Sequence, residues 1–198
     1  MGLDIRSYSK LENKGMPQGY ESEDFDIWEI VNIDDDSFIF YNDGSNSYSV
    51  EYKLADGGSR FGIDRCDDLY PGLYHESHET CSHSFSAGSY GCYNDFRRDI
   101  CLCVNGVHPQ EIWENPDKWR KSPLFELINF SDCEGRIGPE VCKKLLNEMK
   151  ENYLNFIKFL VDSYSEYDIH SIEYYKIRYE NFIKCFEIAS ENGVVIFS

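Results

Sequence analysis

The segment FSAGSYGCYNDFRR, residues 85–98, places small and hydroxylated residues directly before a predicted helix at about 90–104. Free backbone N–H groups at a helix N-terminus stabilise an anion. Arg97 or Arg98, one to two turns further on, would add a charge-assisted clamp. The alternative is an ordinary turn and helix cap with surface arginines. The segment is not a P-loop, because the Gly-Lys-Ser/Thr ending is missing.

A second polar segment, ELINFSDCEGRIGP at 126–139, begins inside a nearly all-apolar run. Loops at the carboxyl ends of buried strands commonly contact ligands in α/β proteins. Asp132 and Glu134 lie in this loop, where they would position a base, a ribose hydroxyl or a metal ion. Two carboxylates this close would also act as general acid and base if burial separated their pKa values. The alternative is that one of them caps the helix predicted to begin at Pro139.

The segment LYHESHETCSH holds four residues of the types that bind zinc, His75, His78, Cys81 and His83. Their spacing matches no known zinc module, because Cys-x2-Cys pairs are missing, so a His-rich loop without metal is the favoured interpretation. The eight cysteines and five histidines of the chain also carry no local signature of a nucleophilic pair. We therefore expect no metal, no catalytic residue and no cofactor, and the interpretation leans away from an enzyme.

Apolar periodicity predicts an α+β fold, in which a small mixed or antiparallel sheet packs against two long C-terminal helices and one central helix. The central helix has Ser89 as its N-cap and Gly106 at its C-terminal end. The long helices run from Pro139 to about 167–168 and from about 171 to 191. The predicted strands are 3–9, 124–130 and 194–197, together with a hairpin of 37–41 and 47–53 joined by the turn NDGSN.

These elements fit a single domain over residues 1–198. Two stretches stand apart from the regular elements. Residues 54–84 are rich in Gly, Asp, Ser and His, and are predicted to be a long irregular excursion. Residues 107–123 contain three prolines and two tryptophans, and are predicted to be a surface connection with a helical turn.

The formal net charge of −17 opposes binding to nucleic acid, whose affinity for proteins comes mainly from Lys and Arg. A hydrophobic share of 41% with 16% aromatics excludes a fully disordered chain. No apolar run approaches the roughly 18 residues of a membrane span, and the start MGLDIRSYSK lacks the pattern of a signal peptide. We therefore expect a cytoplasmic protein with reduced thiols and no membrane partner.

Several blocks resemble a family of uncharacterised phage and prophage proteins. The chain opens with the family's Met-Gly-Leu-Asp-Ile, residues 85–94 with Arg97 resemble F-x-AGSYSGYN-x-x-R, and 123–141 resembles PFxELIxFSDxEGxIGPxV. The tail at 179–197 is similar as well, so that the resemblance covers roughly half of the chain. Gly91-Cys92 departs from the family's more frequent Ser-Gly, which removes a hydroxyl at that turn. The resemblance implies a viral origin and action in the cytoplasm of an infected host cell, but brings no established activity.

Polar positions in these blocks form the candidate ligand site: Ser89, Tyr90, Tyr93, Asn94, Arg97, Asp132 and Glu134. The favoured hypothesis is a phage protein that binds and sequesters a small anionic or nucleotide-like ligand in counter-defence. One alternative is an acidic inhibitor that binds a host protein, and another is a carboxylate- and metal-dependent hydrolase. The chain is also compatible with a homo-oligomer.

Overall fold

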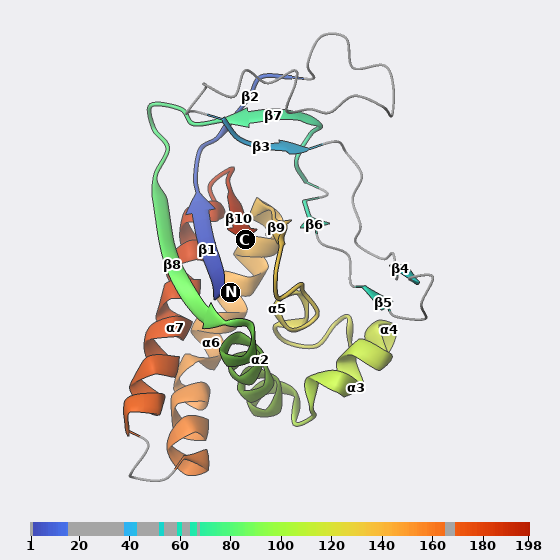
Figure 1. Ribbon diagram of the computed structural model, residues 1–198, viewed down its shortest axis with the longest axis vertical. Coiled ribbons are helices and arrows are strands. Elements are labelled where there is room, and N and C mark those ends of the chain that lie inside the picture. Colours follow the sequence, from blue (N-terminus) through green and yellow to red (C-terminus); the bar gives the residue numbers. More distant parts are fainter. Residues whose placement is uncertain are drawn as a thin grey trace.

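The computed structural model describes residues 2–15, 38–42, 52–53, 59–60, 64–66, 68–164 and 169–198, and all structural statements below concern these residues. It has the predicted α+β fold (Figure 1). The main sheet has the strand order β6-β9-β10-β1-β8. Its strands are β6 (Asp64–Arg65), β9 (Gly135–Ile137), β10 (Val194–Phe197), β1 (Gly2–Tyr8) and β8 (Ser82–Ser89). The sheet is mixed, because β6 runs parallel to β9 while the other neighbours are antiparallel.

Strand β1 shows why only one face of this sheet packs against the core. Leu3, Ile5 and Ser7 are buried and alternate with exposed residues, as the two-residue repeat of a strand requires. Leu3 and Ile5 belong to a large apolar cluster shared with three helices. These are α2 (Tyr90–Asn105), α6 (Pro139–Ser163) and α7 (Ile169–Ala189), which are the central helix and the two long C-terminal helices of the prediction (Figure 1).

A second, smaller apolar cluster forms where Val194 of β10 meets a three-stranded antiparallel sheet. That sheet consists of β2 (Glu12–Asn13), β7 (Gly72–His75) and β3 (Phe38–Asn42). Phe40 of β3 and Tyr74 of β7 stack at 4.6 Å between ring centroids. Figure 1 shows this sheet beyond the end of the main sheet, away from the long helices.

Two predictions in the first half of the chain need correction. Residues 38–42 form a strand, but β3 pairs with β7, and β4 (Tyr52–Lys53) pairs with β5 (Ser59–Arg60). Asn42, the first residue of the predicted turn NDGSN, ends β3, while residues 37 and 43–51 lie outside the described residues. The stretch 54–84 contains β5, β6, β7 and the beginning of β8. These strands are too short for a periodicity to show in the sequence.

The predicted strand at 124–130 is wrong, because the chain forms a short helix there, α5 (Phe125–Ile128). All seven residues are buried, so the apolar run predicted burial correctly and the type of element incorrectly. Leu124 has φ +57° and donates its N–H to Glu148 Oε2 of α6 at 2.7 Å. Leu124 lies in the turn that leads directly into α5.

The helix boundaries agree closely with the prediction. Ser89 is the N-cap of α2 and accepts a hydrogen bond from Cys92 N at 3.2 Å, and Gly106 at the other end has φ +68°. α6 begins at Pro139, ends at Ser163 rather than near 167–168, and α7 precedes the last strand, β10. The segment 107–123 contains α3 (Pro109–Glu114) and α4 (Pro116–Trp119). Among the described residues, no helix has both the length and the apolarity to span a bilayer.

Candidate functional site

The two polar segments of the sequence meet along one side of α2. Arg97 donates from Nη1 to the carbonyl oxygen of Phe130 and from Nη2 to Oδ1 of Asn94. Asn94 in turn donates from Nδ2 to Asp132 Oδ2 at 2.7 Å. Arg97 Nη2 also lies 4.0 Å from Asp132 Oδ2. Three of the seven candidate residues, Asn94, Arg97 and Asp132, therefore form one hydrogen-bonded cluster.

The Arg97 guanidinium is enclosed by aromatic rings as well as by acceptors. Its central carbon lies 5.3 Å from the ring centroid of Tyr93 and 4.9 Å from that of Trp113, within the range of cation–π attraction. The residue is only 5% exposed. Arg97 therefore joins α2 to the chain after α5, and its charge faces protein groups rather than the surface.

Side-chain donors from other segments hold the chain around α5 through its backbone carbonyl groups. Ile128 O accepts from Trp113 Nε1 at 3.0 Å, Asn129 O accepts from Arg65 Nη2 at 3.1 Å, and Phe130 O accepts from Arg97. The last carbonyls of a helix lack partners within the helix, so side-chain donors from elsewhere must satisfy them when they are buried. The block 126–139 thus has an evident role in folding. Sequence reasoning missed it because Arg65 and Trp113 lie in other segments.

The remaining candidates lie in different surroundings. Ser89 caps α2, and Tyr90 is half-buried against the core. Tyr93 is fully buried, its hydroxyl has no hydrogen-bond partner among the described residues, and burial raises its pKa to about 12. Glu134 is exposed, and no hydrogen bond or ion pair joins it to Asp132 within the described chain.

A residue that the sequence did not single out, Arg178 of α7, lies at the beginning of α2. Its Nη1 donates to Cys92 O at 2.7 Å. Its Nε and Nη2 are buried without a hydrogen-bond partner in the described part of the chain. An arginine offers five N–H donors, and a buried donor without an acceptor costs free energy. Arg178 therefore uses less of its hydrogen-bonding capacity than Arg97, the other buried arginine beside α2.

Gly88 lets this guanidinium approach the backbone closely. A side-chain carbon at Gly88 would lie 3.0 Å from Arg178 Nη2 and 2.7 Å from Tyr174 Oη, so those two groups occupy the space that a side chain would need. Gly88 also has φ +86°, a conformation that glycine adopts without strain. The missing side chain therefore leaves a notch that the Tyr174 hydroxyl and the Arg178 guanidinium fill, next to Ser89 and the first turn of α2. Free N–H groups, a helix dipole and an unpaired guanidinium edge are the donors that bind an oxyanion.

Signals for Arg178 in the sequence are weak. It is separated from Cys92 by 86 residues, and no motif surrounds it. The one clue is its position on α7 directly before Tyr179, on the helix stripe that is otherwise apolar. An arginine at such a position must be covered by aromatic rings or find acceptors in the core.

The four residues of the proposed His/Cys loop do not gather around one point. His75 is buried in β7, while His83 Nε2 lies 2.9 Å from Asn181 Oδ1 of α7. Among the described residues, no group of three or more His, Cys, Asp or Glu side chains is placed to hold a metal ion.

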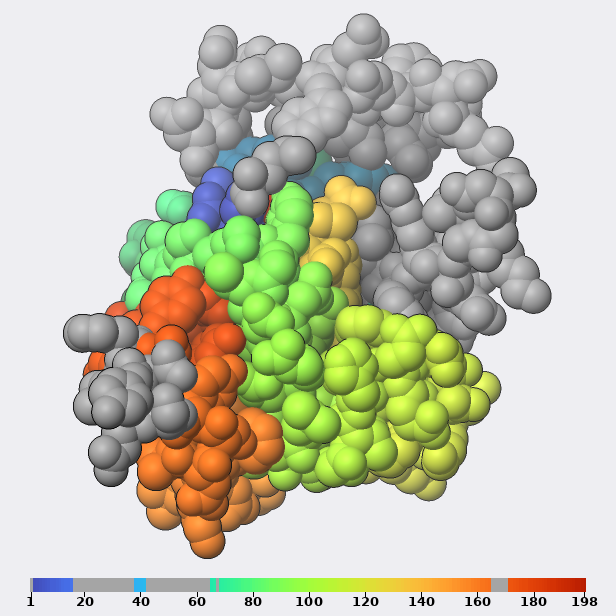
Figure 2. Space-filling model, turned by 60° about the horizontal axis from the view of Figure 1, so that its bottom comes forward, coloured from blue at the N-terminus to red at the C-terminus, as the bar shows by residue number. Residues whose placement is uncertain are grey.

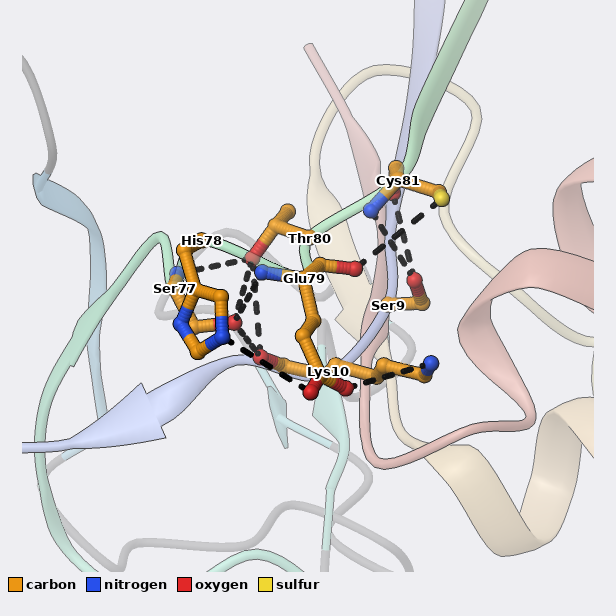
Figure 3. Close-up of polar contacts among 7 residues, drawn as sticks. All are labelled: Ser9, Lys10, Ser77, His78, Glu79, Thr80 and Cys81. Atoms are coloured by element: carbon orange, nitrogen blue, oxygen red, sulfur yellow. Dashed lines mark hydrogen bonds and ion pairs between the residues drawn. The ribbon is translucent and has the colours of Figure 1, made fainter.

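The turn at 77–81 instead fastens the chain that leaves β1 (Figure 3). Ser77 Oγ donates to Lys10 O at 2.8 Å, and Cys81 N donates to Ser9 Oγ at 3.1 Å. Lys10 Nζ and Glu79 Oε2 add an ion pair at 3.4 Å. The polar residues of this loop therefore account for a structural contact between β1 and β8.

An open, polar depression of about 440 Å³ lies between β1 and β8, lined by Arg6, Tyr8, Ser82, His83 and Ser84. Arg6 and Tyr8 alternate with the buried residues of β1, so the depression lies on the face of the sheet away from the long helices. It is separate from the Gly88 notch and provides an independent cation, Arg6.

Figure 2 shows the surface around the helices, with α2 in green beside the orange and red of α6 and α7. Gly88 lies at the end of β8, directly before α2, and Arg178 lies in the middle of α7. The two residues are adjacent because β8 runs along α7 and leads directly into α2. Comparison of the chain with protein-family models, with curated proteins and with solved structures yielded no match.

Proposed function

We propose that this protein binds a small phosphate-bearing, nucleotide-like ligand at the beginning of α2, with Arg178 as the anion anchor. One observation carries the proposal: Arg178 keeps Nε and Nη2 buried and without hydrogen-bond partners in the described chain, beside a helix N-terminus and in close approach to Gly88. Leaving two guanidinium nitrogens unpaired costs stability, and an oxyanion would satisfy both at once.

This assignment moves the anchor from Arg97 to Arg178. Arg97 Nη1 and Nη2 already donate to Phe130 O and Asn94 Oδ1, so they do not need a ligand. Ser89 and Tyr90 remain beside the bound anion. Together with the resemblance to phage proteins, the site suggests a role in the cytoplasm of an infected cell, where sequestering a nucleotide-like signal would act as counter-defence.

The first experiment is a calorimetric titration of the whole protein with adenosine 5′-monophosphate and with inorganic phosphate. We expect saturable binding that Arg178→Met weakens at least tenfold, because a charge-assisted hydrogen bond contributes about 1.5–3 kcal/mol. The matched control is Arg6→Met, which removes a cation from the separate depression and should leave the affinity unchanged. Binding that is lost in Arg6→Met and retained in Arg178→Met would place the ligand elsewhere and overturn the proposal, as would no binding at all.

The exposed thiols offer a second readout that does not depend on a mutation. Cys92 is exposed in the first turn of α2, and its Cβ lies 3.4 Å from the position that a side-chain carbon at Gly88 would take. Bound ligand should therefore slow alkylation of Cys92 by iodoacetamide. Cys133 and Cys81 are exposed away from the notch and serve as internal controls. Equal protection of the three thiols, or of none, contradicts ligand binding at α2.

A further inference from the structure

The proposed anion anchor is closed in this structure. Arg178 is only 2% exposed, and its free Nε and Nη2 do not reach the surface. Its guanidinium carbon lies 5.3 Å from the ring centroid of Phe96, 5.7 Å from that of Tyr175 and 4.3 Å from that of Tyr174. A ligand can therefore contact the free nitrogens only if one of the surrounding rings moves.

Of these rings, Tyr174 is the one that can be displaced. Phe96 is 0% exposed and stacks with Phe182 in the main core at 5.7 Å between centroids. Tyr174 is 45% exposed, whereas Tyr175 is half-buried. Tyr174 is kept in place by stacking on Arg178, by its hydroxyl against Gly88 and by a tilted contact with Tyr175 at 6.3 Å. Of the three rings around the guanidinium, Tyr174 is therefore the one that can rotate toward solvent.

The surface beside Tyr174 is apolar. Ile177 follows three residues later on α7 and is 48% exposed. Residues three apart on a helix are neighbours on its surface, so Tyr174 and Ile177 form a ledge directly outside the anion anchor. Large apolar side chains left exposed next to a buried cation fit a ligand that has a charged end and a flat apolar end.

We infer that Tyr174 is a displaceable cover of Arg178 that stacks on a planar base once the phosphate is bound, so that the ligand is a nucleoside phosphate rather than a simple anion. This inference rests on the proposed function. Displacing Tyr174 costs its cation–π contact with Arg178, and stacking on the base returns a similar contact. Inorganic phosphate has no base, so its binding displaces Tyr174 without a new stacking contact. Tyr174 therefore makes the site selective against phosphate and other small anions.

The test compares two probes in the same variant. In Tyr174→Ala, the affinity for inorganic phosphate should rise several-fold, because the anchor is already open. The affinity for adenosine 5′-monophosphate should fall about tenfold, because base–aromatic stacking is lost. Tyr174→Phe keeps the ring and should stay within about twofold of the wild type for both probes. Tyr70→Ala, which truncates another exposed tyrosine, should change neither affinity.

The outcomes separate this inference from the proposed function. If Tyr174→Ala changes both affinities in the same direction, or changes neither, Tyr174 is not a selective cover, and the inference is overturned. In that case Arg178→Met still tests the anchor itself. If the wild type binds neither probe, the proposed function fails as well. Urea denaturation of each variant shows that a changed affinity does not reflect partial unfolding.

Discussion

Two buried arginines flank the first half of α2, and they differ in how fully they are paired. Both lie against aromatic rings, Arg97 against Tyr93 and Trp113, and Arg178 against Phe96 and Tyr174. Arg97 donates from two of its three nitrogens to a backbone carbonyl and an amide oxygen. Arg178 donates from one and keeps two unpaired within the described chain.

This difference separates a group that holds the fold from a group that is kept for another purpose. Removing a buried cation that donates to several protein groups leaves those groups without a partner, which is among the more destabilising single changes. Removing a buried group that is poorly paired loses little and relieves a desolvation cost. The same substitution should therefore destabilise the protein much more at Arg97 than at Arg178.

The largest effect is expected for Arg97→Met. The substitution leaves Phe130 O and Asn94 Oδ1 without their donor, so we expect a loss of about 2–4 kcal/mol in the free energy of unfolding. Urea denaturation followed by circular dichroism measures this loss. Arg120→Met removes an exposed ion pair with Asp117 and should cost under about 0.5 kcal/mol. A loss below about 1 kcal/mol for Arg97→Met would abolish the distinction between the two arginines.

A smaller loss, about 1–3 kcal/mol, is expected for Asn94→Ala, because Asn94 accepts from Arg97 and donates to Asp132. Asn105→Ala on the same helix removes an exposed bond to Pro123 O and is the matched control. The double variant with Arg97→Met should lose less than the sum of the two single losses, since both changes break one network. Additive losses would show that Asn94 and Arg97 act independently.

The free energy of unfolding should depend on pH through Tyr93, which lies against Arg97. Burial raises its pKa to about 12, while an unfolded tyrosine ionises near pH 10. The neutral hydroxyl therefore contributes stability that is fully present below about pH 10 and is lost as the pH rises through about 12. Between pH 9 and pH 11 the wild type should lose about 1 kcal/mol more than Tyr93→Phe in urea denaturation. Equal losses in the two proteins would mean that the hydroxyl is hydrated.

The smallest effect on stability is expected for Arg178→Met. Cys92 O lies within α2 and keeps its helical hydrogen bond, and methionine fills much of the space between the rings. The free energy of unfolding should stay within about 1 kcal/mol of the wild type while the affinity for adenosine 5′-monophosphate falls at least tenfold. A loss as large as that of Arg97→Met would mark Arg178 as a structural residue.

Much of the fold could be predicted from local signals in the sequence. Ser89, Gly106 and Pro139 mark helix ends through their own backbone chemistry, and they stand at those ends in the structure. The prediction of a strand at 124–130 was wrong because an apolar run is compatible with a strand or with a buried helix. The turn that begins this helix is held by Glu148, which accepts from Leu124 N and lies more than twenty residues away in the sequence.

The sequence grouped the residues of the two polar segments as one candidate site, and the structure brings three of them together. Asn94 and Arg97 of α2 form a hydrogen-bonded cluster with Asp132, whereas ligand binding there stays a prediction. The unpaired state of Arg178 depends on what surrounds it in space: Gly88 from one end of β8, Phe96 from α2 and Tyr174 from its own helix. No local pattern records such a convergence.

The position of β1 in the main sheet has a consequence for how the chain reaches this structure. β1 lies between β8 and β10, with Ile5 opposite Phe85 on one side and opposite Phe197 on the other. Asp4 and Ser198 exchange backbone hydrogen bonds of 2.8 and 3.0 Å. The second partner of β1 therefore leaves the ribosome after both long helices have been made. Because contacts between such distant segments slow folding, β1 must wait with one edge open until β10 has been synthesised.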